Sequence, residues 1–219
     1  KTIYANEVKG EIKKMLKIDA DETINQVSLL EMKNLPATKK KDGDEIAVYY
    51  AYGDIVDEVA SSMSSGHNIV GSEVCKDLDA LAADDDVKAV VLRVNSPGGS
   101  AFASEQIWHS LMQLKAKKPV VVSMGGYAAS GGYYISCAAN YIYAEPMTIT
   151  GSIGIFGMFP DISGLLTDKL GVKFDEVKTN KHATFGTFSR PFNDEEMAYL
   201  NAYVERGYNL FRKRVADGR

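Results

Sequence analysis

Short, continuously apolar runs alternate along this chain with longer segments in which apolar residues recur at helical spacing. The apolar runs predict strands at 46–55, at 87–95 and at the start of 119–140, with shorter strands within 141–160 and at 172–179. The helically spaced segments predict helices around Val74–Leu81 and at 104–117, 161–170 and 193–219. Strands that are apolar on both faces and alternate with helices are typical of an α/β fold, here a mostly parallel sheet covered by helices.

The first 44 residues follow a different pattern. Apolar residues within 6–16 predict a short amphipathic helix, and the stretch after it alternates weakly and ends in Pro, Asp, Gly and a lysine run. This composition is typical of a connector, and Lys39–Lys41 are interpreted as solvated linker residues. The sequence therefore predicts two parts, an inter-domain helix and linker at 1–44 and the main domain at 45–219.

Composition narrows the classes of function. The 219 residues are 45% hydrophobic, enough for one sizeable core, and the net charge of −4 gives no indication of nucleic-acid binding. No run of about 18 apolar residues predicts a membrane span. The histidines and the two cysteines, Cys75 and Cys137, have no metal-ligand spacing, so no metal or other cofactor is predicted. The cysteines are either free buried thiols or a pair formed in an oxidising compartment.

Two strand-to-helix junctions are unusually rich in small residues. NSPGGS at 95–100 carries Gly99, and MGGYAASGG at 124–132 carries Ser130 and Gly131. In sheets of this kind, binding and catalytic sites form at such junctions. A hydroxyl at a helix N-terminus beside free amides suits acyl transfer, so Ser130 is the predicted nucleophile and the N–H groups of Gly99 and Gly131 are the predicted oxyanion donors. The alternative is that each motif is a tight turn with a capping serine.

A serine nucleophile requires a base. The histidines are His67 in a polar loop, His109 on a helix and His182 after the nucleophile, and no Asp or Glu pattern singles one out for a Ser-His-Asp triad. The other option is a lysine whose amine is desolvated until it is neutral at the working pH. The residue pattern leaves both options open.

Three motifs together carry a family resemblance. VVLRVNSPGGS, VVVSMGGYAASGGYYIS and TITGSIGIFG resemble the signal peptide peptidase A family of Ser-Lys peptidases, over roughly 46–219. The resemblance implies the Clp protease/crotonase fold, the nucleophile at Ser130 and the oxyanion amides at Gly99 and Gly131. It also sets Ser152 close to the active site, where it would orient the base; the alternative for Ser152 is an ordinary turn serine.

The general base of the family pattern is absent from its usual place. Short family members carry a segment like Ile-Lys-Ser-Gly-x-His-Lys, and here residues 177–183 read Val-Lys-Thr-Asn-Lys-His-Ala. Lys178 matches the first lysine, and Ala183 stands where the base is expected. Long members have two tandem halves, with the serine in the C-terminal half and the lysine in the N-terminal half. We therefore interpret the chain as such a C-terminal half, truncated at its C-terminus and inactive alone, with Lys181 as the fallback base in the same chain.

The resemblance also implies substrates, partners and a location. The expected substrates are cleaved signal peptides in an apolar groove, for which Met124, Tyr133 and Phe156 are candidates, with core packing as the alternative for each. The expected partners are the N-terminal half of the same protein and further copies in a homo-oligomer. Membrane association is expected through a segment outside this sequence, on the extracytoplasmic (periplasmic) side of a bacterial inner membrane. Two other functions stay open, a crotonase-type acyl-CoA hydratase or isomerase and a non-catalytic half that builds an oligomer.

Overall fold

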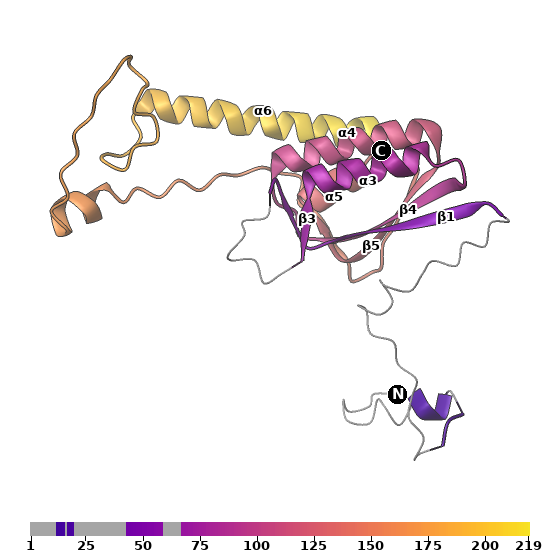
Figure 1. The fold of residues 1–219 in the computed structure, drawn as a ribbon. Helices are drawn as coiled ribbons and strands as arrows, with labels where there is room; N and C mark the ends of the chain where they lie inside the picture. The colour runs from indigo at the N-terminus through magenta and orange to yellow at the C-terminus, as the bar shows by residue number, and fades with distance from the viewer. Residues whose placement is uncertain (1–11, 16, 20–42, 59–66) are drawn as a thin grey trace. The chain divides into compact units, whose positions relative to one another are not determined.

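The computed structural model describes residues 12–15, 17–19, 43–58 and 67–219 (Figure 1). The chain divides into two compact units, residues 1–42 and 43–219. In the first unit, residues 12–15 are helical, and the rest of the predicted helix and most of the connector lie outside the described residues. The second unit contains every residue of the predicted site.

The second unit alternates strands and helices. Its strands are β1 (Glu45–Tyr52), β2 (Asp54–Val56), β3 (Asn68–Val70), β4 (Val87–Ser96), β5 (Val120–Ala129), β6 (Tyr141–Tyr143) and β7 (Ile149–Gly151). Its helices are α3 (Gly71–Ala83), α4 (Ala101–Lys117), α5 (Gly131–Ser136), the π-helix η1 (Leu165–Lys169) and α6 (Asp194–Gly218). This succession confirms the predicted α/β fold class.

A parallel sheet forms the centre of the unit. Its order is β1-β4-β5-β6, and β7 pairs with the end of β5 beyond β6. Parallel strands end at the same edge of a sheet, so the two glycine motifs, which follow β4 and β5, come together there. The pairing of Ser96 with Ala128 shows this directly. The sheet therefore places both predicted junctions side by side.

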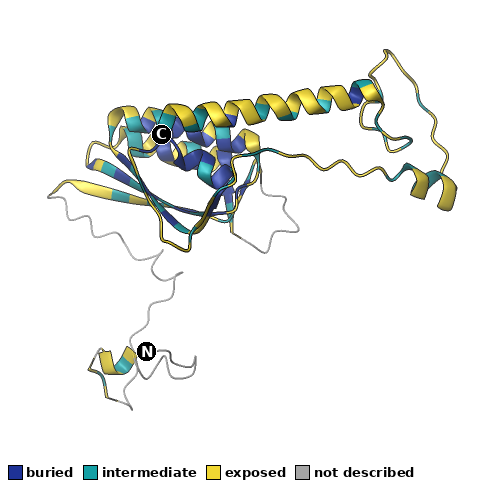
Figure 2. Cartoon of the chain, turned by 180° about the vertical axis from the view of Figure 1, so that it is seen from behind, coloured by how far each residue is buried: buried dark blue, intermediate teal, exposed yellow. Residues whose placement is uncertain are grey.

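Helices α3, α4 and α5 lie over one face of the sheet (Figure 1). The apolar core between them is closed to solvent at Leu78, Leu92, Ile107, Leu114 and Val122. Burying a Leu, Ile or Val side chain of this kind contributes about 1.5–3 kcal/mol. In Figure 2 the buried residues are concentrated between the sheet and these helices, which makes this layer the rigid base of the site.

The opposite face of the sheet presents apolar side chains to solvent. On β1, the side chains of Ile46, Val48, Tyr50 and Tyr52 alternate with residues that face the core, and Tyr50 is 73% exposed. The two tyrosines of β6 are exposed as well. Parallel sheets are usually covered on both faces. In the described part of the chain, the prediction of a helix-covered sheet is correct for one face only.

Three predicted elements differ from the structure. The run 46–55 is broken at Gly53, whose φ is 106° and where a Cβ would lie 1.8 Å from the carbonyl oxygen of His67, so β2 leaves the main sheet and pairs with β3. The predicted strand at 172–179 is not formed, because no described strand lies beside it to complete a ladder. The predicted helix at 161–170 is reduced mainly to the short η1.

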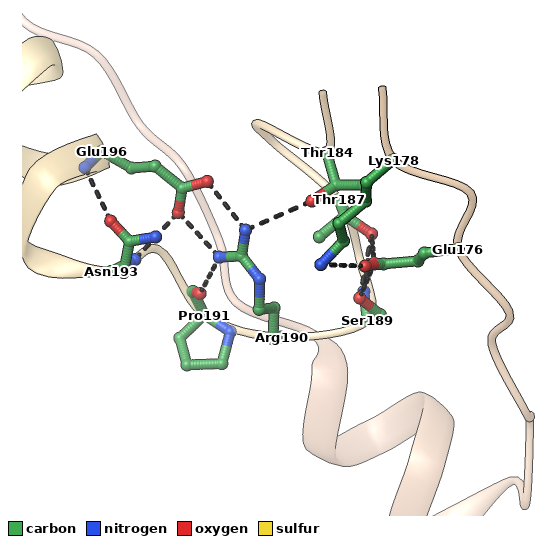
Figure 3. A network of polar contacts seen from close by, with 9 residues as sticks. All are labelled: Glu176, Lys178, Thr184, Thr187, Ser189, Arg190, Pro191, Asn193 and Glu196. Carbon is green, nitrogen blue, oxygen red and sulfur yellow. Dashed lines mark hydrogen bonds and ion pairs between the residues drawn. The ribbon is translucent and has the colours of Figure 1, made fainter. Parts of the chain in front are cut away.

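Residues 172–193 are fastened to the start of α6 by polar contacts (Figure 3). Asn193 and Glu196 form a capping box, with each side chain accepting from the other's N–H at 2.9 Å. Arg190 donates twice to the Glu196 carboxylate, at 2.7 and 2.8 Å, and Glu196 is only 1% exposed. Figure 3 shows a second group, in which Glu176 accepts from Ser189. Charge-assisted hydrogen bonds therefore help to hold this segment, together with the aromatic contacts of Phe192 with Phe159 and Phe185.

Candidate active site

Ser130 lies between β5 and α5 in a strained backbone conformation. Its φ is 50° and its ψ is −120°, a combination that non-glycine residues rarely adopt. Its N–H donates to the carbonyl oxygen of Gly151 at 2.9 Å, which ties the turn to β7. Strain of this kind costs on the order of 1–3 kcal/mol and is concentrated at functional sites. The surrounding structure, and not the preference of a serine, therefore holds Ser130 in place.

The Ser130 hydroxyl is not used as a helix cap. Within the described part of the chain it makes no hydrogen bond, and α5 has no side-chain cap. Ser100 behaves differently: its hydroxyl accepts from the N–H of Ala103 at 3.2 Å, caps α4 and donates to Asp57 at 2.6 Å. The alternative of a turn with a capping serine therefore fits Ser100 and does not fit Ser130.

Two glycines are required where the motifs pack against each other. A Cβ at Gly98 would lie 2.6 Å from the nitrogen of Gly131 and 2.8 Å from the Cβ of Ser130. A Cβ at Gly131 would lie 2.6 Å from the Oγ of Ser104. All three distances are shorter than a Cβ atom tolerates, so only glycine lets the loop after β4 lie directly against the nucleophile.

The predicted oxyanion donors are unpaired. The N–H of Ile55 donates to the carbonyl of Gly98 at 2.9 Å and the N–H of Ser100 donates to the carbonyl of Ile55 at 2.8 Å, which leaves the N–H of Gly99 outside this bridge. Gly131 is the first residue of α5, where an N–H has no acceptor within the helix. Neither N–H has a hydrogen-bond partner among the residues that the structure describes.

A cavity of about 860 Å³ joins these groups. Ser130, Gly99, Gly131 and Ser152 all line it, so the structure brings four of the five predicted site residues together. The segment after β7 and α6 add an apolar side to the cavity, with Ile155, Phe156, Tyr203, Leu210 and Phe211. The remaining lining comes from β2, the loop after β4, α4 and α5, and it includes polar groups such as Asp54, Ser104 and Glu105. A cavity of this size and composition can take an apolar peptide segment beside the nucleophile.

The fifth predicted residue, Lys181, lies elsewhere. No lysine or histidine of the described residues lines the cavity. Lys181 is 72% exposed and pairs with Glu195, which raises the pKa of the Lys181 amine, whereas a neutral base requires a lowered pKa. His182 lies 3.5 Å from the same carboxylate, and His67 and His109 contact other side chains. The roles assigned to Lys181 and Ser152 stay predictions.

The cavity wall contains a polar cluster that the sequence analysis missed. Glu105 on α4 accepts from the hydroxyl of Tyr134 on α5 and from the guanidinium of Arg214 on α6, which lies 3.8 Å from the centre of the Trp108 ring. Burial, and then the hydrogen bond to Glu105, raises the pKa of the Tyr134 phenol. Glu105 is separated from Tyr134 by 29 positions and from Arg214 by 109, so no local motif joins them.

The three groove candidates have different positions. Phe156 lines the cavity and is 90% exposed. Met124 is buried in the main core, and Tyr133 packs against the edges of two apolar clusters. The structure therefore supports a groove position for Phe156 and core packing for the other two.

Three further features of the described residues concern metal ligands, membrane spans and cysteines. Among these residues, no group of three His, Cys, Asp or Glu side chains is placed to hold a metal ion, and no helix there has the length and apolar character to cross a bilayer. Cys75 and Cys137 are free thiols. Burial raises the pKa of the Cys137 thiol to about 11, so this thiol stays protonated at neutral pH.

Comparison with known proteins places this α/β fold in the class of peptidases. The family model for Clp protease matches residues 47–163, more than half of the chain. The model for peptidase family S49 matches residues 112–219. The chain belongs to peptidase family S49, on the Clp protease fold.

Several relatives are similar over most of the chain. Protease 4 of Haemophilus influenzae is 42% identical over 213 residues, 96% of this chain and 32% of that protein. Serine protease SPPA, chloroplastic, of Arabidopsis thaliana is 31% identical over 223 residues, 99% of this chain and 32% of that protein. Putative signal peptide peptidase SppA of Enterococcus faecium is 33% identical over 168 residues, 76% of this chain and 48% of that protein. The chain thus spans about a third to a half of the length of these relatives.

Proposed function

We propose that this chain supplies the nucleophile and the oxyanion hole of a serine endopeptidase that works by a Ser-Lys dyad. The Oγ of Ser130 attacks the carbonyl carbon of a peptide bond, and the N–H groups of Gly99 and Gly131 stabilise the negative charge that develops on the carbonyl oxygen. A neutral lysine amine accepts the proton of Ser130 and delivers it to the leaving nitrogen as the C–N bond breaks. The same amine then activates the water that hydrolyses the acyl ester.

The state of Ser130 is the single observation that carries this proposal. Its backbone is strained, its hydroxyl has no hydrogen bond in the described part of the chain, and it lines a cavity with two unpaired amides. A structural serine would be expected to use its hydroxyl, as Ser100 does at the start of α4. An activated serine beside oxyanion donors is the arrangement that acyl transfer requires.

The lysine is proposed to come from an N-terminal half of the complete protein. No lysine of the described residues lines the cavity, and Ala183 occupies the position of the family's base. The relatives from Haemophilus influenzae and Arabidopsis thaliana are about three times as long as the matched region, which leaves room for a second half. Lys181 would have to leave Glu195 and lose its charge in order to replace that lysine.

The proposed substrates are signal peptides after their cleavage from secreted proteins. The apolar lining of the cavity suits such segments, and the relative from Enterococcus faecium has signal peptide peptidase in its name. A homo-oligomer at the extracytoplasmic side of a bacterial inner membrane belongs to the same proposal and rests on the family resemblance.

Labelling with a fluorophosphonate probe tests the nucleophile. The complete protein that contains this chain is expected to be labelled at Ser130, and Ser130→Ala is expected to abolish both labelling and peptide cleavage, because the attacking oxygen is lost. Ser72→Ala, at an exposed position of α3, is the matched control and should change neither.

Three results would contradict this proposal. Retained peptide cleavage after Ser130→Ala would favour a non-catalytic half. Binding of an acyl-CoA thioester, together with turnover that does not depend on Ser130, would favour a crotonase-type enzyme. Turnover by the isolated chain that disappears in Lys181→Ala would place the base in this chain.

A further inference from the structure

The two loops that carry the oxyanion amides lead directly into helices that touch each other. The Gly99 loop continues into α4, and Gly131 begins α5. One turn into each helix, the side chains meet: the Tyr134 hydroxyl on α5 donates a hydrogen bond to Oε2 of Glu105 on α4. The distance between the two amides therefore depends on how these two helices are joined.

A third element secures the same carboxylate. Arg214 of α6 donates from Nη2 to Oε1 of Glu105 at 2.5 Å and from Nε to Oε2 at 3.3 Å. The Arg214 guanidinium lies over the Trp108 ring of α4. The side chain of Arg214 is 22% exposed and that of Glu105 is 32% exposed. Tyr134 is fixed in turn, since its ring packs against Phe211 at 4.6 Å between centroids. Glu105 thus has its rotamer set by α6 and presents one fixed acceptor to Tyr134.

We propose that Glu105 is a positioning residue that acts through Tyr134 to set the spacing of the Gly99 and Gly131 amides around the oxyanion. This inference rests on the proposed function, because it assumes that both amides bind the developing charge. Oxyanion donors stabilise the transition state over a narrow range of distances, and small displacements are costly. Apolar packing, for example at Ile107 and Ile135, keeps α4 and α5 together without the hydrogen bond, so its loss alters geometry more than stability.

Tyr134→Phe in the complete protein isolates this hydrogen bond, because it keeps the ring against Phe211 and removes only the hydroxyl. We expect kcat and kcat/KM for an apolar peptide to fall about tenfold with little change in KM, and the rate of fluorophosphonate labelling to fall in parallel. The Ki of a peptide aldehyde, which forms a hemiacetal oxyanion with the serine, should rise by a similar factor. Glu105→Ala should behave like Tyr134→Phe, whereas Glu105→Gln keeps an acceptor for the phenol and should retain most of the activity.

Tyr49→Phe is the matched control. Tyr49 also donates its phenol to a carboxylate, Asp77, at 2.8 Å, but it joins β1 to α3 and does not line the cavity. Wild-type kcat/KM, labelling rate and aldehyde Ki in Tyr134→Phe, with labelling abolished by Ser130→Ala, would overturn the positioning role and leave the proposed function standing. A loss in Tyr134→Phe that raises KM and lowers Tm together would overturn it in favour of a merely structural role. Labelling that survives Ser130→Ala would overturn both proposals.

Discussion

At the residue scale, the backbone conformation of Ser130 that the proposed function requires lowers the stability of the fold. Its positive φ costs free energy that the fold must supply, and the surrounding contacts, from Gly98 on one side to the Gly151 carbonyl on the other, leave no room for the backbone to relax. A residue without a Cβ would adopt this conformation with little strain. The serine at position 130 is thus expected to lower the free energy of unfolding relative to a glycine at the same position.

Ser130→Gly should therefore stabilise the chain relative to Ser130→Ala. Glycine relieves the positive-φ strain, and alanine keeps it, so we expect a difference of about 1 kcal/mol in the free energy of unfolding, or a few degrees in Tm. Both variants lose the nucleophile, which makes the pair a matched comparison. Thermal unfolding by circular dichroism measures the difference; a glycine variant no more stable than the alanine variant would show that the conformation is not strained.

The sequence alone was sufficient to single out candidate residues that belong to a local motif. Ser130, Gly99 and Gly131 follow apolar strands directly, and at both glycines a Cβ would collide with a neighbouring segment. The sequence could not predict the cluster of Glu105, Tyr134 and Arg214, because these residues lie on three different helices and meet only in the folded chain. The position of the general base could not be predicted either, since ion pairs such as Lys181 with Glu195 depend on how the chain folds back.

At the element scale, periodicity predicted the long elements and failed where a partner decides the outcome. β4, β5, α4 and α6 have strong patterns and formed as predicted. The segment 172–179 alternates like a strand, but a strand needs a neighbour, and here its Glu176 bonds to Ser189 and Thr187 instead. An alternating pattern indicates which face of a strand can be buried, but strand formation also requires a neighbouring element that covers this face.

The start of α6 should respond to acid. Two hydrogen bonds from Arg190, and then the N–H of Asn193, hold the pKa of Glu196 at about 2, below its ordinary value of 4.5. Because the folded pKa is lowered, the stabilising contribution is present above about pH 4.5 and is lost as the pH falls toward 2. Hydrogen exchange of residues 190–200, corrected for intrinsic rates, should show constant protection from pH 7 to 5 and falling protection below pH 4.

Arg190→Met tests the cause of this behaviour. It leaves the buried Glu196 carboxylate without its main donor, so protection of the same residues should already be low at pH 7. Lys213→Met is the control, because Lys213 pairs with Asp217 on the exposed surface of the same helix, where ion pairs contribute little. Equal protection in Arg190→Met and wild type would remove Arg190 as the cause.

At the scale of the whole molecule, one face of the parallel sheet has no cover among the described residues. Aromatic and β-branched side chains of β1 and β6 form its surface, with Arg93 between them, where it donates to Ser123 at 2.8 Å and to the Met124 carbonyl at 2.9 Å. Exposed apolar area of this kind favours association. The isolated chain should therefore bind hydrophobic dyes through this face.

The double variant Val48→Lys with Tyr50→Lys tests that expectation. It places two charges on the exposed face and should lower the fluorescence of bound anilinonaphthalene sulfonate, while Tm changes by less than about 2 °C because both positions are at the surface. Ser72→Lys with Ala80→Lys, on the exposed side of α3, adds the same charges elsewhere and should leave the fluorescence unchanged. Equal dye binding in both variants would place the apolar surface elsewhere in the chain.

The way α6 is attached gives the molecule a lever. Its C-terminal end is the fulcrum, where Phe211 packs on Tyr134 and Arg219 donates to the Cys137 carbonyl at 2.7 Å. From Phe211 back to Asp194 the helix runs about 26 Å, so a tilt of about 5° at the fulcrum displaces its start by about 2 Å. The cavity-lining residues of α6, Tyr203 to Phe211, lie near the fulcrum on the side that leads to the loop carrying Arg190. A tilt of this size would also move the α6 side of the cavity, by a smaller amount because these residues lie close to the fulcrum.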